Sequence, residues 1–323
     1  MSLHRRPIHM AVDVDLGARS YTVHFQSLAS VPELLSRAAS GLSPGRCLLV
    51  SDENVAAHYR SPLVQGLRDA GWTVRPVVLP PGESTKSASH LHTLYDEALE
   101  WGIDRDTPVL ALGGGVVGDL AGFAAATLLR GVPLVQLPTS LLAQVDASVG
   151  GKTAINHATG KNLIGAFYQP ALVCADPNTL DTLPMREYTS GMAEVVKHAL
   201  IQAPALFAYL EAHLVPVMAR TDRAVVAEVI ERAVQVKADV VSADEREEGR
   251  RAILNFGHTF AHALERAAGY GAFTHGEAVA LGMRAGLYLS HRRHPQALDR
   301  DRLDHVVDAI PIPGRPEDVA FED

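Results

Sequence analysis

The amino-acid sequence predicts an α/β domain followed by a predominantly helical domain, and three observations support this prediction. The length of 323 residues is about twice that of an average domain of roughly 150 residues. In the first half, short apolar runs alternate with amphipathic stretches, as in parallel strands joined by crossover helices. After about residue 170, long helical patterns follow one another. We therefore expect an α/β domain over residues 1–170 and a helical domain over residues 171–323.

The expected elements of the first half alternate in type. Apolar runs predict strands at residues 47–50, 74–79, 109–112 and 134–137, and amphipathic stretches predict helices at residues 61–71, 87–102 and 118–130. In such a sheet, ligands bind at the carboxyl ends of the strands, here residues 51–53, 80–83, 113–115 and 138–140. The second half predicts helices at residues 186–201, 203–218, 224–241, 254–268 and 275–292.

The composition, 47% hydrophobic and 20% charged, indicates a folded soluble globule. The formal net charge of −8 argues against partners such as nucleic acid or an anionic membrane. Cys47 and Cys174 lie in apolar runs and are expected to be buried thiols of a reducing compartment. The most apolar window carries Asp119 and Arg130, and no apolar segment follows the basic N-terminus, so no membrane span or export signal is expected. We therefore expect a cytoplasmic protein.

A glycine-rich segment follows the third expected strand. Residues 113–118 (GGGVVG) satisfy G-x-G-x-x-G between a strand and a helix, which is the context of a dinucleotide-binding loop. Glycines let the backbone approach a pyrophosphate, and the helix N-terminus supplies N–H groups. The usual ribose-binding acid is missing after the next strand, but Asp52 and Glu83 end two earlier strands. A tight turn without a ligand is the alternative interpretation.

A second glycine segment, residues 150–153 (GGKT), superficially suggests a P-loop. Asp146 occupies the position of the required first glycine, so a nucleotide-hydrolysing loop is excluded. Lys152 and Lys161 nevertheless accompany glycines in residues 146–161, which suits an anion in an acidic protein. An ordinary solvated loop is the alternative.

Histidines and a carboxylate suggest a metal site in the second half. His258 and His262 are spaced i and i+4 and project from one helical face. A capping-box sequence at residues 274–277 places His275 in the first turn of the next helix. Glu194 and Lys197 are paired at i and i+3. One carboxylate and two imidazoles suit Zn²⁺ with an open position for substrate, whereas ordinary surface histidines are the alternative in a chain with 15 of them.

The motifs together resemble those of 3-dehydroquinate synthases, sugar-phosphate cyclases of the shikimate pathway and of aromatic amino acid biosynthesis. The resemblance runs from about residue 48 to residue 275. It rests on the order and spacing of LPPGE (79–83) with Lys86, GGGVVGDLAG (113–122), QVD (144–146) with SVGGKT (148–153), GKNLIGAFYQ (160–169), AEVVK (193–197) and LNFGHT (254–259).

The resemblance implies an N-terminal Rossmann-like NAD-binding α/β domain and an all-α C-terminal metal-binding domain, the dehydroquinate synthase-like fold, with the active site in the cleft between them. It implies a carbon–oxygen lyase that converts 3-deoxy-D-arabino-heptulosonate 7-phosphate into 3-dehydroquinate and phosphate. The implied metal ligands are Glu194, His258 and His275, with Zn²⁺ as the expected ion and Co²⁺ as an alternative.

The resemblance also assigns the remaining site residues. Cofactor contacts would be Asp52, Glu83, Lys86, Gly115, Val116, Val117, Gly118, Asp119, Thr139, Ser140, Lys152, Lys161, Thr179 and Thr182. Substrate contacts would be Asp146, Lys152, Asn162, Lys197, Lys237, Glu247, Arg251, Asn255 and His262, with Arg130 reaching in from a neighbouring subunit. Lys152 would lie between nicotinamide and substrate, and a homodimer is the expected assembly.

Three departures from the family pattern accompany the resemblance. Ser140 stands where a second threonine is usual, and Ala261 stands where glycine is usual. The chain ends at Asp323, before the family's lysine-rich C-terminal segment that closes over the substrate phosphate. Elimination of phosphate is expected to be poorly supported without that lysine.

Three other functions compete with this interpretation. A related cyclase, such as a 2-deoxy-scyllo-inosose or valiolone-type synthase, would act on a neutral sugar phosphate and would not need Arg251 and Lys237. A metal-dependent polyol dehydrogenase would not need the anion cluster of Lys152, Asn162 and Lys197. A non-catalytic homologue that lacks the C-terminal segment would bind only nucleotide or partner proteins.

Overall fold

The structure is a computed structural model that describes residues 11–37, 42–268, 272–296 and 299–312. The chain divides into two compact units, of which the first ends at Thr182 and the second begins at Leu183. The expected boundary near residue 170 therefore falls inside the first unit. The reason is that β9 (Leu172–Cys174) pairs in parallel with two strands of that unit, β2 and β6.

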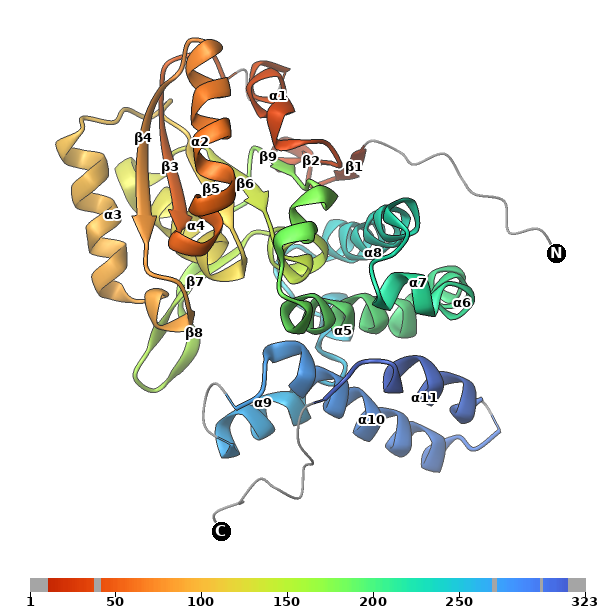
Figure 1. Cartoon of the computed structure of the whole chain (residues 1–323). Coiled ribbons are helices and arrows are strands. Elements are labelled where there is room, and N and C mark those ends of the chain that lie inside the picture. Colours follow the sequence, from red (N-terminus) through yellow and green to blue (C-terminus); the bar gives the residue numbers. More distant parts are fainter. Residues whose placement is uncertain (1–10, 38–41, 269–271, 297–298, 313–323) are drawn as a thin grey trace. The chain divides into compact units, whose positions relative to one another are not determined.

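The first unit is built on a seven-stranded sheet in the order β1-β2-β9-β6-β5-β3-β4 (Figure 1). Besides β9, its strands are β1 (Ala11–Val14), β2 (Tyr21–His24), β3 (Arg46–Asp52), β4 (Thr73–Leu79), β5 (Val109–Gly113) and β6 (Leu134–Pro138). All neighbours are parallel except β1 and β2. Every residue of β5 and β6 is buried, as expected for strands covered on both faces. Pro76 lies in β4, where the sheet edge tolerates its missing N–H.

Helices cover both faces of this sheet (Figure 1). Side chains of α1 (Val31–Arg37) and α2 (Glu53–Asp69) join the core on one face, and those of α3 (Ala88–Glu100) and α4 (Gly115–Thr127) join the core on the other. The adjacent strands β3 and β5 thus send their helices, α2 and α4, to opposite faces. Such a switch point opens a crevice at the carboxyl ends of the two strands. Asp52 and the glycines after β5 lie at these ends.

Short helical turns complete the first unit. They are η1 (Gly17–Arg19), η2 (Leu28–Ser30), η3 (Glu83–Thr85), η4 (Leu128–Arg130), the π-helical turn η5 (Ala143–Ala147) and η6 (Pro177–Thr182). Both cysteines are buried free thiols, as expected, and burial raises the pKa of each to about 12. The expected helix at residues 61–71 begins earlier, at Glu53, because the Asp52 carboxylate caps it by accepting a 3.1 Å hydrogen bond from Val55 N–H.

The alternative interpretation of residues 146–161, an ordinary solvated loop, is wrong for much of that segment. β7 (Lys152–His157) and β8 (Gly160–Phe167) form an antiparallel hairpin that packs on α4. A Cβ atom at Gly122 of α4 would lie 2.5 Å from Thr153 Cγ2, and one at Gly165 would lie 2.1 Å from the Thr153 carbonyl oxygen. Glycine at both positions therefore permits the close approach within the hairpin and between the hairpin and α4.

The second unit is helical, as expected. Its elements are α5 (Met185–Gln202), α6 (Pro204–Ala212), α7 (Leu214–Met218), α8 (Arg223–Ala243), η7 (Arg250–Asn255), α9 (His258–Ala267), α10 (His275–Arg293) and α11 (Arg300–Asp308). The helix α5 is continuously buried from Tyr188 to Ala199, and α6, α8 and α10 pack against it. None of the helices that the structure describes is long and apolar enough to cross a membrane.

Two expected helices of this unit differ in their bounds. The single helix expected at residues 203–218 is two helices that meet at His213. Pro216 explains the break, because its ring would clash with the carbonyl group four residues earlier in a continuous helix. The helix expected at residues 254–268 begins only at His258, because its N-cap residue Gly257 has a left-handed φ of 82°, which a continuous helix does not allow.

Two glycines let α10 approach its neighbours at backbone distance. A Cβ atom at Gly276 would lie 1.9 Å from the Ser190 carbonyl oxygen of α5. A Cβ atom at Gly282 would lie 1.9 Å from the Gly257 carbonyl oxygen at the start of α9. The helices that carry Glu194, His258 and His275 therefore lie so close together that only glycine fits at these two contacts.

We predict that Gly282→Ala destabilises the protein by about 3 kcal/mol, because the new methyl group meets backbone rather than a movable side chain. Gly66→Ala in α2 is the matched control. Its Cβ atom would have a nearest neighbour at 3.8 Å, so the better helix propensity of alanine should stabilise by about 0.5–1 kcal/mol. Thermal unfolding of both variants checks the prediction, and equal midpoints would contradict it.

Candidate functional site

The glycine loop lies between β5 and the N-terminus of α4. Gly113 is required by packing, since a Cβ atom there would lie 2.7 Å from Val117 Cβ. A Cβ atom at Gly118 would lie 2.9 Å from Gln136 Oε1, which is the movable end of a side chain. Packing does not require Gly114 and Gly115, since the nearest atoms to their Cβ positions are at 3.4 Å and neither has positive φ. The N-cap residue Gly114 also offers no side chain to the first turn of α4. No side chain caps the first turn of α4, and such a helix N-terminus suits an anion.

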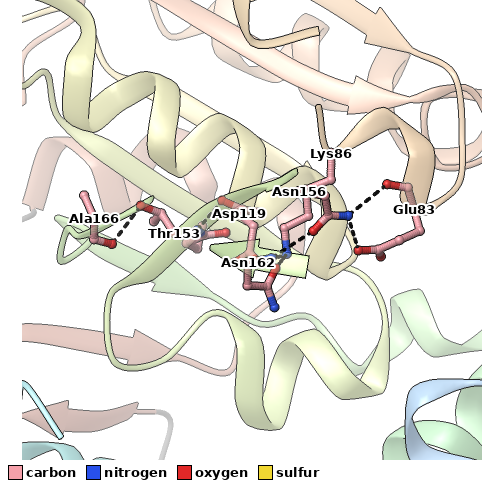
Figure 2. A network of polar contacts seen from close by, with 9 residues as sticks. Glu83, Lys86, Asp119, Thr153, Asn156, Asn162 and Ala166 are labelled. Atoms are coloured by element: carbon pink, nitrogen blue, oxygen red, sulfur yellow. Dashed lines mark hydrogen bonds and ion pairs between the residues drawn. The ribbon is translucent and has the colours of Figure 1, made fainter. Parts of the chain in front are cut away.

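A polar network lies beside this loop (Figure 2). Lys86, which is buried, forms an ion pair with Asp119 of α4 and donates to Asn162 Oδ1. Asn156 donates to Glu83 Oε1 at 2.7 Å and accepts from Asn162 N–H at 3.0 Å. Lys86 therefore contacts Asp119 and Asn162 directly, all three being residues that the resemblance assigned to the site. Asn156, which the resemblance did not assign, joins Glu83 to them.

The expected threonine contacts lie near the ends of β6 and β9. Thr179 is buried, and its hydroxyl accepts from Gln144 Nε2 at 3.0 Å and donates to the Asp176 carbonyl at 2.8 Å. Thr182 bonds its hydroxyl to that of Tyr59 at 2.6 Å. The buried Thr139 and the half-buried Ser140 follow β6, and Ser140 Oγ accepts from Ala143 N–H at 3.3 Å. The hydroxyls of Ser140, Thr179 and Thr182 therefore bond within the protein, after the carboxyl ends of β6 and β9.

The other expected residues of the first unit lie on the turns and the hairpin. Arg130 is exposed on a turn with φ of 68°, and Asp146 is half-buried on the π-helical turn. Lys152 is exposed at the start of β7, and Lys161 is half-buried on β8. Val116 and Val117 lie in the first turn of α4, where only Val117 is buried.

Glu194, His258 and His275 come together in the second unit, from α5, α9 and α10. Each offers one ligand atom, and these atoms all lie within 4.8 Å of one another. Nε2 of His258 is 3.8 Å from Glu194 Oε1, and Nε2 of His275 is 3.5 Å from it. The pairing of Glu194 and Lys197 is confirmed as a buried ion pair on the other carboxylate oxygen. His262, on the same face as His258, is exposed, with its ring centroid 5.6 Å from that of His258.

The opposite ring nitrogens of both histidines face acceptors. Nδ1 of His258 lies 3.4 Å from the Phe256 carbonyl oxygen, and Nδ1 of His275 lies 3.8 Å from the buried carboxylate of Glu265. This arrangement, in which Nδ1 is held and Nε2 faces the carboxylate, is typical of metal-binding histidines. Burial lowers the pKa of His275, but Glu194 and Glu265 outweigh that effect and raise it to about 9. The surroundings of His275 therefore favour a positive charge.

Glu265 is a functional candidate that the sequence interpretation missed. It follows His258 by seven residues, which is two helical turns, so the spacing itself places both on one face of α9. Its partner His275 lies on another helix, and only the packing of α9 on α10 shows that they meet.

The loop between α8 and α9 carries three expected substrate contacts. Asn255 Nδ2 donates to Glu247 Oε1 at 2.9 Å, and Glu247 has a left-handed φ of 62°. Arg251 is 1% exposed and donates to the Glu245 carbonyl oxygen. Lys237, also expected here, is buried on α8.

Asp244 organises this loop and was also missed. Its carboxylate accepts from three backbone N–H groups, those of Glu248, Gly249 and Arg251, each at 2.9 Å. The Arg251 and Glu248 N–H bonds are the main causes that hold the pKa of Asp244 below its ordinary value. The loop conformation creates these bonds, so no pattern in the sequence could have identified them.

We predict that Asp244→Ala opens this loop and speeds amide hydrogen exchange at residues 248, 249 and 251 at least tenfold. Asp239→Ala, which removes an exposed carboxylate of α8, should leave that exchange unchanged. Because folding lowers the pKa of Asp244, its stabilisation is complete above the unfolded value of about 3.9 and is lost as pH falls through the folded value. Protection in Asp244→Ala equal to that of the wild-type protein at pH 6 would contradict this role.

Comparison with known proteins identifies the family. Residues 76–190 match the model of the 3-dehydroquinate synthase N-terminal domain, and residues 191–323 match that of the C-terminal domain. A curated 3-dehydroquinate synthase of Salinibacter ruber is 80% identical over 314 residues, which cover 97% of this chain and 85% of that protein.

Two solved structures have closely similar folds. The 2-epi-5-epi-valiolone synthase of Streptomyces hygroscopicus, with NAD⁺ and Zn²⁺ bound, has a TM-score of 0.81 at 30% identity, covering 97% of this chain and 85% of its own. A 2-deoxy-scyllo-inosose synthase complexed with carbaglucose-6-phosphate, NAD⁺ and Co²⁺ has a TM-score of 0.81 at 26% identity, covering 97% and 83%. With both family models spanning the chain from residue 76 onward, the chain belongs to the 3-dehydroquinate synthase family.

Proposed function

We propose that this protein converts 3-deoxy-D-arabino-heptulosonate 7-phosphate into 3-dehydroquinate and phosphate, with NAD and a divalent metal ion as cofactors. The observation that carries the proposal is the cluster of Glu194, His258 and His275 in a chain of this family. The glycine loop at the switch point of the first unit supports the nucleotide, and the high identity to the Salinibacter ruber synthase supports the substrate.

The glycine loop fits a dinucleotide. Gly114 and Gly115 lack a packing reason for being glycine, and a pyrophosphate at the N-terminus of α4 would supply one. Asp52 and Glu83 follow two neighbouring strands and would bond the ribose hydroxyls. Asp52 Oδ1 already accepts from Val55 N–H, so its second oxygen would face the ligand.

The donor set of the second unit fits Zn²⁺. One carboxylate and two imidazole nitrogens leave an open position for substrate. The three ligand atoms lie within 4.8 Å of one another, so small side-chain adjustments would place each of them about 2.0–2.2 Å from a shared ion. Co²⁺, which the inosose synthase binds, suits the same donors. When bound, NAD supplies a hydride acceptor and the metal supplies a Lewis acid that acidifies a hydroxyl group.

The protein's own residues would orient and neutralise an anionic sugar. Lys197, Lys237 and Arg251 are buried cations of the second unit in a protein whose net charge is −8. Arg251 and Lys237 would meet the substrate carboxylate, whereas Lys152, Asn162 and Asp146 of the first unit and Asn255, Glu247 and His262 of the second would complete the polar contacts. Fixed charges of this kind act mainly by positioning and by stabilising developing negative charge.

The proposal includes a homodimeric assembly and a cytoplasmic location. Arg130, exposed on a left-handed turn, is the residue we propose to reach a neighbouring subunit in a homodimer. Two buried, free thiols are consistent with the reducing cytoplasm as the place of action.

The direct test is phosphate release from the heptulosonate phosphate by purified protein with NAD⁺ and Zn²⁺. We expect release that requires both cofactors and is absent with glucose 6-phosphate. Reaction with a neutral sugar phosphate instead would favour the related cyclases, whose folds match with TM-scores of 0.81. Bound NAD without turnover of any sugar would favour a non-catalytic homologue.

We predict that Glu194→Ala, His258→Ala and His275→Ala each retain less than a tenth of the wild-type zinc after dialysis, because two donors do not hold the ion. His58→Ala, which removes an exposed histidine of α2, should keep the wild-type amount. Elemental analysis of the folded proteins measures this directly. Stoichiometric zinc in the three variants would disprove the assignment of the ligands.

A further inference from the structure

We propose that Asn156 is a positioning residue of the nucleotide site, which holds the carboxylate of Glu83 and the backbone of Asn162 in one fixed arrangement. The inference rests on the proposed function, in which Glu83, Lys86 and Asp119 contact NAD. Asn156 itself is not among the proposed contacts with NAD or substrate.

The hairpin releases Asn156 from strand pairing. Ile155 pairs with Ile164 and His157 pairs with Gly160, so the register shifts around Asn156. Its backbone N–H donates instead to the Lys86 carbonyl oxygen at 2.8 Å. Between these two pairs, residue 156 of β7 faces residues 161–163 of β8, so Asn156 stands outside the strand ladder. Its backbone bond to Lys86 attaches β7 to the segment that carries Glu83 and Lys86.

The side chain of Asn156 uses both ends of its carboxamide (Figure 2). Nδ2 donates to Glu83 Oε1 at 2.7 Å, and Oδ1 accepts from Asn162 N–H at 3.0 Å. Only a side chain that carries a donor and an acceptor on one planar group can make both bonds. An aspartate at this position would keep the bond to Asn162 but would face Glu83 with a second negative charge.

The bond to Asn162 extends the effect to Lys86 and Asp119. Asn162 has a left-handed φ of 59°, a conformation that asparagine tolerates better than most residues but that still needs support. Its Oδ1 accepts from Lys86 Nζ, which also pairs with Asp119. Asn156 therefore connects the exposed carboxylate of Glu83 to the buried cation of Lys86 through one intervening residue.

The constraint matters because Glu83 is exposed. An exposed carboxylate samples several rotamers, and fixing one before the ligand arrives lowers the entropy lost on binding. Removal of Asn156 should therefore weaken nucleotide binding without removing any group that touches the nucleotide.

The test is the dissociation constant of NAD⁺ measured by isothermal titration calorimetry on the full chain. We expect Asn156→Asp to weaken binding at least tenfold, because like charges would meet at a hydrogen-bond distance. Gln65→Glu is the matched control. Gln65 Nε2 also donates to a carboxylate at 2.7 Å, that of Asp69, at the far end of α2, so the same chemical change there should leave the dissociation constant unchanged.

A double variant separates positioning from loss of structure. In Asn156→Asp combined with Glu83→Gln, donor and acceptor exchange places and the bond can re-form. We expect the double variant to bind NAD⁺ no more weakly than Glu83→Gln alone, whereas a merely structural defect would add to the loss. Asn156→Ala, which removes both side-chain bonds and keeps the backbone bond, should bind at least fivefold more weakly than the wild-type protein.

The outcomes distinguish this inference from the proposed function. A wild-type protein that does not bind NAD⁺ would overturn both. Wild-type binding with unchanged dissociation constants in Asn156→Asp and Asn156→Ala would overturn only the role of Asn156. Additive losses in the double variant would likewise overturn it.

Discussion

Both units depend on one constraint: at a few contacts, neighbouring elements lie so close together that a side-chain methyl group would not fit between them. In the helical unit, Gly276 and Gly282 bring α10 against a carbonyl of α5 and a carbonyl at the start of α9, and the three metal-ligand candidates are carried by these helices. In the α/β unit, Gly122 and Gly165 permit the hairpin to close and to pack on α4. The hairpin in turn carries Asn156 and Asn162. The positions of the site residues therefore depend on glycines at contacts outside the site.

Buried charges form the second level of organisation. Glu194 pairs with Lys197 on the same helix, and Glu277, 1% exposed, accepts from Arg186 at 2.8 Å while it closes the capping box of α10. A buried charge without a partner would cost several kcal/mol, so each of these pairs makes its burial tolerable rather than stabilising the fold by itself. The pair of Glu277 and Arg186 also links α10 to α5. Glu277 lies two residues after His275, so this pair fixes the first turn of the helix that carries the histidine.

Polar side chains with several partners connect the site to the scaffold. Asn156 joins the turn η3 to the strand β8 through one carboxamide, and Asp244 accepts from three backbone N–H groups through one carboxylate. Both lie beside expected contact residues rather than among them. Contact residues such as Glu83 and Glu247 are exposed or half-buried on irregular backbone, which by itself holds them weakly. Their orientation therefore depends on neighbours that the reaction does not use.

The sequence by itself determined the fold class, the glycine loop, the capping box that places His275 in the first turn of α10, and the spacing of His258 and His262. Each follows from periodicity or from bonds between residues close in the chain, which are local rules. Pro216 broke an expected helix although it was visible in the sequence, and the hairpin at residues 152–167 was missed because its strands pair only with each other and carry exposed apolar side chains. Only the tertiary structure decided that Glu265 meets His275, that Asn156 links Glu83 to Asn162, and that Asp244 shapes the loop around Arg251. These contacts depend on how helices pack and on where the register of the hairpin shifts. Such geometry arises from the whole fold rather than from any segment of the chain.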